Sequence, residues 1–243
     1  MRPAAGIVTN RLIVALSAPD RHLLDGRMHA VTLKKVEILF EPGDSIVNVH
    51  FPGAGTIAAL VVSMRNGATA EAAMIGQEGA IGGLISAGDK PAFTRGVIQI
   101  VGPAWRLATD DLEEAKTHSH TLRDHVARYA DCLLAQVMQS VACNTIHDAE
   151  PRLARWLLTT QDRIGGSDLH LTQEFIAEML GVQRTYVTRI VGNLEERGAI
   201  RSARGTIVIV DRALLRRQAC ECYAYLRRHF ERLLPGVYGN ADE

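Results

Sequence analysis

The sequence predicts an α+β fold in three parts: an antiparallel β jelly-roll barrel, a long dimerisation helix and a winged helix-turn-helix at the carboxyl end. Short β-prone runs separated by turn residues fill residues 31–107, as in a barrel. A helical pattern with one apolar stripe follows residue 109, and residues 171–210 combine two short helices with a small hairpin. We therefore divide the chain into residues 1–108, 109–147 and 148–243.

The composition is that of a globular protein, with 47% hydrophobic and 22% charged residues among 243. The formal net charge is zero, but residues 151–243 carry 14 basic against 11 acidic residues, and all of the basic ones are Arg. This excess permits a nucleic-acid partner without requiring one. No apolar run reaches the roughly 18 residues of a membrane span, and the amino end lacks the pattern of a secretory signal. We expect a cytoplasmic protein with no membrane partner.

Two short helical segments, residues 10–18 and 20–24, are expected before the first strand. The β-prone runs then span residues 31–33, 37–40, 45–51, 57–62, 70–75, 96–101 and 105–107. Asn66-Gly67 is the sharpest hairpin signal between them, because both residues accept the left-handed backbone of a two-residue turn. Gly102-Pro103 is expected to be another turn. Strands of this length and spacing indicate an antiparallel barrel or jelly roll.

A helix of some thirty residues is expected after Thr109, which is a suitable N-cap. Its apolar stripe consists of Leu122, Val126, Tyr129, Leu133, Val137 and Val141. The stripe could pack on the barrel or on a second copy of the helix. A break is expected at residues 147–148, and Pro151 then opens a further helix that runs to residue 164.

Residues 171–200 have the pattern of a helix-turn-helix. Thr172 is expected to cap the first helix, and Gly181 to end it in a left-handed conformation. The spacing of Ala177, Gly181 and Val187 suits a close helix approach, a turn and a buried filler between the helices. An ordinary helical hairpin with a solvated basic face is the alternative. A second hairpin around Arg204-Gly205 favours the winged motif, and residues 169–171 are a candidate third strand.

The tail, residues 212–234, is expected to form one amphipathic helix. The four cysteines are too few and too scattered for a disulfide framework, and they suit a reducing compartment. Cys220 and Cys222 fall on the predicted tail helix, where residues two apart point to different faces. A metal or redox role is the alternative, but core packing is the preferred interpretation. We therefore expect no metal and no cofactor.

The order of these parts, together with five segments, resembles the Crp/Fnr family of bacterial transcription regulators. The segments are residues 41–44 (EPGD), 49–52 (VHFP), 75–79 (IGQEG), 150–157 (EPRLARWL) and 171–200. The resemblance implies a homodimer that binds a palindromic site in double-stranded DNA, with a cyclic-nucleotide-binding-like barrel as sensor and RNA polymerase as a further candidate partner. It also favours a second copy as the partner of the apolar stripe, because two-fold symmetric sites are read by two-fold symmetric proteins. No enzymatic activity is expected.

The best-known ligand of this family is a cyclic nucleotide, whose pocket needs a carboxylate for the ribose and, about ten residues on, an arginine for the phosphate. In this chain Gly83 replaces the carboxylate and Phe93 replaces the arginine. Burying a phosphate without its counter-charge costs on the order of several kcal/mol. We expect no tight cyclic-nucleotide binding. Another small effector, a protein partner or a purely structural barrel remain as alternatives.

The resemblance also implies which residues read DNA, through a recognition helix near residues 183–196. Arg184 and Arg189 coincide with the two base-contacting arginines of the family, and each can donate two hydrogen bonds to guanine. Thr185 stands where the family often has a glutamate, so a different half-site is expected. The full set of expected DNA-contacting residues is Thr172, Gln173, Gln183, Arg184, Thr185, Tyr186, Thr188, Arg189, Arg201 and Arg204.

Two other classes of protein remain as alternatives. A cupin-like metal protein would need clustered histidines and carboxylates, whereas the barrel segment offers only His29, His50, Glu71 and Glu78, without tight spacing. A protein-interaction module would use the basic helix for a protein partner. Duplex binding that weakens steeply as salt rises favours DNA over that module.

Overall fold

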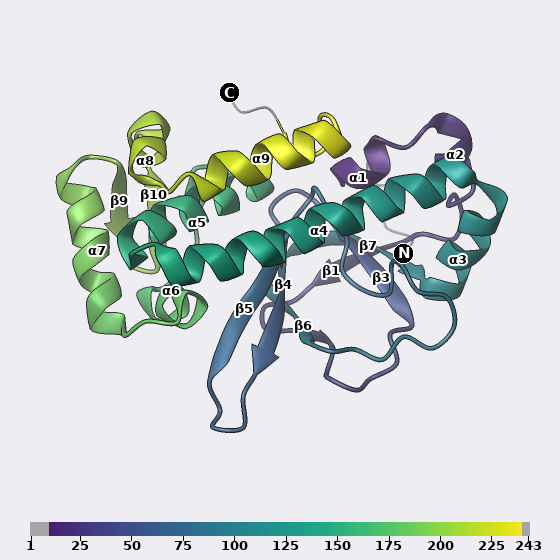
Figure 1. Ribbon diagram of the computed structural model, residues 1–243, viewed down its shortest axis with the longest axis horizontal. Helices are drawn as coiled ribbons and strands as arrows, with labels where there is room; N and C mark the ends of the chain where they lie inside the picture. The colour runs from purple at the N-terminus through teal and green to yellow at the C-terminus, as the bar shows by residue number, and fades with distance from the viewer. Residues whose placement is uncertain (1–9, 240–243) are drawn as a thin grey trace.

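The computed structural model describes residues 10–239 and has the three predicted parts (Figure 1). Two short helices, α1 (Arg11–Val14) and α2 (Ala18–His22), precede the strands. The strands are β1 (His29–Leu33), β2 (Ile38–Phe40), β3 (Asn48–Pro52), β4 (Ile57–Ser63), β5 (Thr69–Ile75), β6 (Arg95–Ile100) and β7 (Gly102–Ala108). They form two antiparallel sheets, in the orders β1-β7-β3 and β2-β6-β4-β5. The two sheets pack as an open double layer, so the jelly roll does not close into a barrel.

Two turn predictions have different outcomes. Asn66-Gly67 lies at the tip of the β4–β5 hairpin, as predicted, but only Gly67 takes the left-handed conformation, at φ 84°, and the loop is longer than two residues. The turn predicted at Gly102-Pro103 is wrong, because both residues begin β7. Pro103 lies at the end of that strand, where the missing N–H costs little, and its carbonyl oxygen accepts hydrogen bonds from Gly53 N and Thr56 Oγ1, both at 2.8 Å.

The predicted long helix is two helices, α3 (Thr109–His118) and α4 (His120–Ile146). Thr109 is the first helical residue rather than the N-cap, a position that Ala108 occupies. The chain is extended at Ser119, whose hydroxyl oxygen accepts a hydrogen bond from Leu122 N and so caps α4. The Ser119 hydroxyl also donates to the carboxylate of Asp20 on α2, at 2.5 Å. The break is therefore fixed by a contact with a distant segment.

The apolar stripe on α4 splits between two environments. Leu122, Val126 and Tyr129 are buried in the core that α4 shares with the sheets and the terminal segments. The Tyr129 hydroxyl donates to Ala80 O at 3.0 Å, and its ring lies so close to Gly79 that a β-carbon there would overlap it. Assigning these three residues to a dimer interface is therefore wrong, because intrachain packing already buries them.

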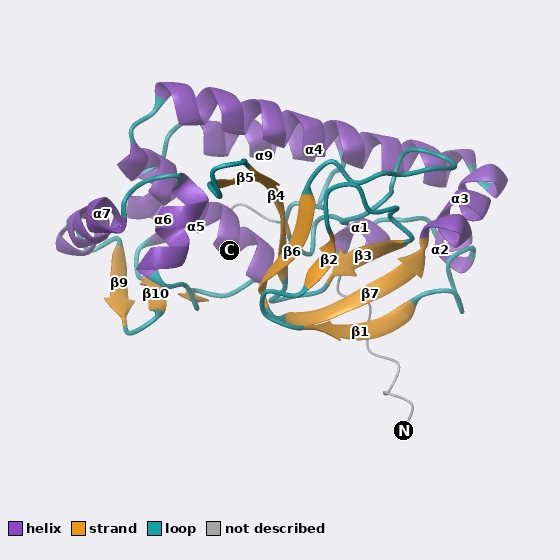
Figure 2. Ribbon diagram, turned by 90° about the horizontal axis from the view of Figure 1, so that it is seen from below, coloured by secondary structure: helices purple, strands orange, loops and turns teal. Residues whose placement is uncertain are grey.

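The carboxyl-terminal part contains α5 (Ala149–Ile164), β8 (Asp168–Leu169), α6 (Gln173–Leu180), α7 (Arg184–Glu196), β9 (Ile200–Ala203) and β10 (Thr206–Ile209). The last two strands form the predicted wing, and β8 pairs with β10 as a short third strand. One apolar core holds the helices and the wing together, centred on buried residues such as Leu157, Val187 and Leu194. This core packs against the inner face of α7, which lies at the end of the molecule opposite α3 (Figure 2).

The single tail helix predicted for residues 212–234 is two helices, α8 (Arg212–Gln218) and α9 (Cys222–Leu233). Ala219 is extended, with ψ 148°, and Cys220 N donates to Pro151 O at 3.4 Å. After this break α9 runs along α4, as Figures 1 and 2 both show. Cys220 and Cys222 therefore do not lie on one continuous helix.

The β4–β5 hairpin reaches from the sheets to the helix-turn-helix. The Thr69 hydroxyl donates to Glu178 Oε1 on α6 at 3.0 Å. Nearer the sheet, Trp156 Nε1 donates to Glu71 Oε1 at 3.2 Å. Residues 67–69 at the hairpin tip line a surface hollow together with Gln183 and Tyr186 at the start of α7.

A buried ion pair links the parts of the chain. Arg163 on α5 binds Glu78, which follows β5, with 2.6 Å between Nε and Oε1, and the side chains are only 1% and 2% exposed. Arg163 also donates to Gln136 Oε1 on α4 at 2.8 Å and to the Tyr238 hydroxyl at 3.3 Å. The Glu78 carboxylate in turn accepts from Gly76 N at 3.1 Å. One guanidinium group thus joins the sheet segment, the long helix α4 and the carboxyl-terminal part.

We expect Arg163→Met to lower the free energy of unfolding by about 3–5 kcal/mol, because it leaves the Glu78 carboxylate buried without a counter-charge. The double variant Arg163→Met/Glu78→Gln should recover part of that loss. Urea unfolding followed by circular dichroism measures both. Arg128→Met removes the exposed pair with Asp124 and serves as the control, with little expected change. A loss from Arg163→Met no larger than that of the control would contradict the role given to the buried pair.

Candidate nucleic-acid interface

The helix-turn-helix has the local geometry that its sequence predicts. The Thr172 hydroxyl oxygen accepts from Phe175 N at 3.2 Å and caps α6. Gly181 ends α6 in the left-handed region, at φ 67°. Ala177 and Val187 are both buried where the two helices meet. The spacing of these residues therefore sets the angle at which α7 is held.

The outer face of α7 is polar, basic and exposed. Gln183, Arg184, Thr185, Thr188 and Arg189 are solvent-exposed, while the opposite face of the helix is buried in the domain core. Gln183 occupies the N-cap position without a side-chain cap, so the first backbone N–H groups of α7 stay available to an acceptor from outside. This face is suited to bind an anionic surface.

Several arginines of this surface lack an internal counter-ion. Among residues 10–239, no salt bridge involves Arg184, Arg189, Arg201 or Arg204. The Arg189 guanidinium instead lies over the Tyr186 ring, 4.6 Å from its centroid. Such stacking holds the guanidinium plane while its donors stay free for phosphate or guanine.

The structure brings all ten predicted DNA-contacting residues to α6, α7 and the wing. Thr172 and Gln173 lie at the start of α6, and the Thr188 hydroxyl donates to Gln173 Oε1 at 2.7 Å. Arg201 lies on β9, and Arg204 lies in the wing turn beside Gly205. Tyr186 is half-buried and packs against the domain core, so it supports Arg189. The three-residue spacing of Tyr186 and Arg189 on one helix is the signal that sequence reasoning missed.

The two candidate carboxylates for a cupin-like metal centre are engaged in separate contacts, and His50 Nδ1 is buried without a hydrogen-bond partner. Glu78 binds Arg163, and Glu71 accepts hydrogen bonds from Gln99 and Trp156. Burial raises the pKa of Glu71 and lowers the pKa of His50 to about 4. Within the part of the chain that the structure describes, the group of potential ligands that does converge lies elsewhere, at the end of α4.

Two antiparallel sheets, a long helix and a winged helix-turn-helix with unpaired arginines are the features that comparison with known proteins can test. Residues 151–218 match the family model of the Crp-like helix-turn-helix domain. No curated protein matches the chain. No helix within residues 10–239 has the length and apolar character needed to cross a membrane.

Solved structures share the fold over most of the chain. FixK2 from Bradyrhizobium japonicum has a TM-score of 0.69 and 16% identity, covering 79% of this chain and 98% of that chain. A CRP-family transcriptional regulator from Thermus thermophilus has a TM-score of 0.63 and 18% identity, with coverage of 78% and 96%. CLP of Xanthomonas campestris, described as a c-di-GMP-responsive global regulator, has a TM-score of 0.63 and 14% identity, with coverage of 79% and 99%. Residues 151–218 are thus a Crp-like helix-turn-helix domain, and the chain as a whole shares the fold of these regulators.

We expect Arg189→Ala to weaken binding to the preferred duplex by about 1–3 kcal/mol more than binding to random duplex, because a base contact carries specificity. Arg204→Ala should weaken both alike, as a phosphate contact does. Fluorescence anisotropy at fixed salt on the two duplexes gives both values. Arg106→Ala, an exposed arginine on β7, is the control for loss of charge alone. Equal losses on both duplexes for Arg189→Ala would contradict the assignment.

Proposed function

We propose that this chain acts as a homodimer that reads a palindromic DNA site with α7 of each copy, under the control of a sensor fold that does not take a cyclic nucleotide. The observation that carries the proposal is the face of α7 with free arginines, presented by a Crp-like helix-turn-helix. On this proposal Arg184 and Arg189 contact base edges in the major groove. Thr172, Gln173, Arg201 and Arg204 contact phosphates, and Thr185 takes a thymine methyl group or a phosphate.

A second apolar face on α4 supports the homodimer. Its residues recur at alternating steps of three and four, which is the spacing of a coiled-coil seam: Ala127, Ala130, Leu134, Val137 and Val141. Leu134 is 56% exposed and Val141 is 64% exposed, although both are large and apolar. Two residues of the stripe predicted from sequence, Val137 and Val141, also belong to this seam. Leu133 instead packs in part against the sheets of its own chain. We assign a second copy of α4 as the partner of this seam, because its apolar residues recur with the same spacing.

A surface hollow adjoins this seam, and we propose it as the effector site. It has a volume of about 710 Å³, and its walls come from residues 82–91 and from α4, where Ala130, Leu134 and Val137 contribute. An effector bound there would touch both the sheets and the dimer helix. Such contacts could favour one arrangement of the two recognition helices over another, because a ligand shifts an equilibrium by its difference in affinity for the two states.

The cavity lacks the features of a cyclic-nucleotide site. A β-carbon on Gly83 would lie 2.5 Å from Cδ of Lys90, so Lys90 already fills the space of a carboxylate side chain. The Lys90 ammonium is paired with Glu113 at 3.2 Å. Phe93 is 86% exposed, and Arg95 is paired with Glu41 at 2.9 Å. These contacts support a mostly apolar effector rather than an anionic one.

We expect Leu134→Glu/Val141→Glu to convert the dimer to a monomer, because four like charges would meet in the seam of the two copies. Sedimentation measures the mass, and selection from a random duplex pool measures the site. The wild type should select inverted repeats, whereas the variant should bind them no better than single half-sites. Val47→Glu, an exposed apolar residue away from α4, is the control. A monomeric wild type that selects no repeat would overturn the proposal.

We expect neither cyclic AMP nor cyclic GMP to bind in the low-micromolar range, because no free cation faces a buried phosphate in the cavity. Isothermal titration calorimetry on the full chain measures this directly. Saturable heat at micromolar concentration with either nucleotide would contradict the interpretation of Gly83 and Phe93.

A further inference from the structure

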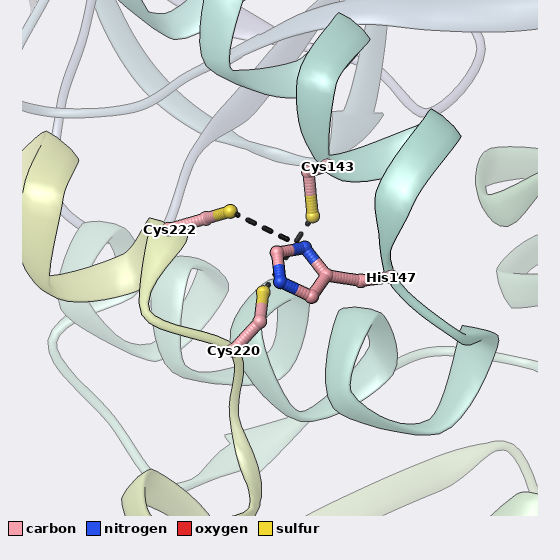
Figure 3. A group of neighbouring side chains, drawn as sticks. All are labelled: Cys143, His147, Cys220 and Cys222. Atoms are coloured by element: carbon pink, nitrogen blue, oxygen red, sulfur yellow. Dashed lines mark hydrogen bonds between the residues drawn. The ribbon is translucent and has the colours of Figure 1, made fainter.

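Four side chains with metal-binding atoms converge where α4 ends. Cys143 lies in the last turn of α4 and His147 is its C-cap residue. Cys220 lies in the break between α8 and α9, and Cys222 is the first residue of α9 (Figure 3). The four ligand atoms all lie within 4.8 Å of one another. Cys143 Sγ is 3.5 Å from Cys220 Sγ, and Cys222 Sγ is 3.6 Å from His147 Nδ1.

The two shorter distances are close to those around a single tetrahedral ion. A zinc ion binds cysteine sulfur at about 2.3 Å and histidine nitrogen at about 2.0–2.1 Å, so tetrahedral angles place two sulfurs about 3.8 Å apart and a sulfur and a nitrogen about 3.6 Å apart. We propose that Cys143, His147, Cys220 and Cys222 form a closed, structural Zn²⁺ site. Three protein thiolates and one imidazole fill the four positions, which leaves none open for catalysis.

The surroundings of His147 prepare it as a ligand. Its Nε2 lies 3.2 Å from Glu221 Oε2, so that nitrogen carries the proton and donates to the carboxylate. The lone pair of Nδ1 then points toward the cysteines. A carboxylate behind a metal-binding histidine fixes the tautomer and the ring orientation and strengthens the ligand. Glu221 stands between Cys220 and Cys222, so the same short segment supplies two ligands and the supporting carboxylate.

The sulfurs have partners that stabilise negative charge. Gln139 Nε2 donates to Cys222 Sγ at 3.0 Å. The Arg155 guanidinium interacts electrostatically with Cys143, and the Arg152 guanidinium does so with Cys143 and Cys220. The Nε atoms of Arg152 and Arg155 are buried without a hydrogen-bond partner. Two cations therefore lie beside a site that would carry one net negative charge when three thiolates bind Zn²⁺.

Two other fates of the cysteines fit the geometry less well. A disulfide between Cys143 and Cys220 would leave Cys222 and the Glu221–His147 pair without a role. An iron–sulfur cluster holds its cysteines around several irons and bridging sulfides, which need more room than a site with all four ligand atoms within 4.8 Å. A mononuclear ion uses all four side chains at once.

The site joins two segments that flank the DNA-binding part. His147 precedes α5, which leads into the helix-turn-helix, and Cys220 follows α8, which packs on α5. A bound ion would therefore cross-link the end of α4 to the far end of the DNA-binding part. Where the chain works as the homodimer proposed above, this link fixes how α7 is held relative to the α4 seam.

The test begins with metal analysis of the full chain purified under reducing conditions, where we expect one zinc per chain. Replacement by Co²⁺ should give the intense visible bands of a tetrahedral centre and thiolate-to-metal charge-transfer absorption. Cys143→Ala and Cys222→Ala should lose the metal. Cys132→Ala is the matched control, because Cys132 is a fully buried cysteine on the same helix outside the cluster and should leave the metal in place.

Two further variants keep the test informative where an alanine variant fails to fold. His147→Cys preserves four ligands, so it should retain zinc and increase the charge-transfer absorption of the Co²⁺ form. Glu221→Gln should weaken zinc affinity about 10–100-fold while circular dichroism stays unchanged. Folded wild-type protein that contains no zinc and gives no tetrahedral Co²⁺ spectrum overturns the proposal, as does equal metal loss in Cys132→Ala.

Failure of the proposed function can be separated from failure of the site. Zinc content and the Co²⁺ spectrum are measured without DNA. If the protein binds zinc but prefers no duplex, the metal site stands and the proposed homodimer that reads a palindrome is wrong. If both hold, removal of zinc by a chelator should weaken binding to the inverted repeat in wild type and in Cys132→Ala. A chelator that leaves repeat binding unchanged while it strips the zinc overturns the link between the site and the orientation of α7.

Discussion

The architecture depends on one buried charge pair, Arg163 with Glu78. Neither side chain can be buried without its partner, because an isolated buried charge costs on the order of several kcal/mol. That cost is comparable to the net free energy of unfolding of a whole domain. Gln136 and Tyr238 satisfy the remaining donors of Arg163, so α4 and the carboxyl-terminal segment are tied to the same point. The helix-turn-helix part cannot rotate away from the sheets gradually, because the first step would separate the two charges. Any rearrangement of this boundary is therefore cooperative.

The chain uses arginine in two opposite ways. Arg163, Arg212 and Arg227 each have a carboxylate partner within the chain, and Asp162 serves the last two at 2.6 and 2.7 Å. These arginines hold α5, α8 and α9 together. Arg184 and Arg204 have no carboxylate partner within the described residues and face solvent. The neutral net charge thus conceals a separation between arginines that stabilise the fold and arginines that are free to meet phosphate. Composition alone could not reveal this separation.

Sequence reasoning succeeded where the cause of a structure is local. Gly181, Gly205 and Asn66-Gly67 specify turns through their own backbone preferences, and the predicted helix-turn-helix, wing and β4–β5 hairpin follow from them. It failed where a contact with a residue distant in sequence determines the local structure. Neither Ser119 nor Ala219 is a helix breaker, yet the chain breaks at both, because Asp20 binds the Ser119 hydroxyl and Pro151 O accepts from Cys220 N. Because the tail was predicted as one continuous helix, Cys220 and Cys222 were expected to point apart. The cysteine cluster was therefore missed. Periodicity likewise located an apolar face on α4, but it could not tell which part of that face the chain itself would cover.

The contact between the β4–β5 hairpin and α6 has a consequence for how this sequence can diverge. Turns at hairpin tips usually tolerate insertions, because they project into solvent. This tip shares a surface hollow with Gln183 and Tyr186 at the start of α7. Extra residues there would stand over the amino-terminal end of that helix. If α7 enters a major groove as proposed, the length of this loop is limited by the duplex, even though its own strands would accept a longer one.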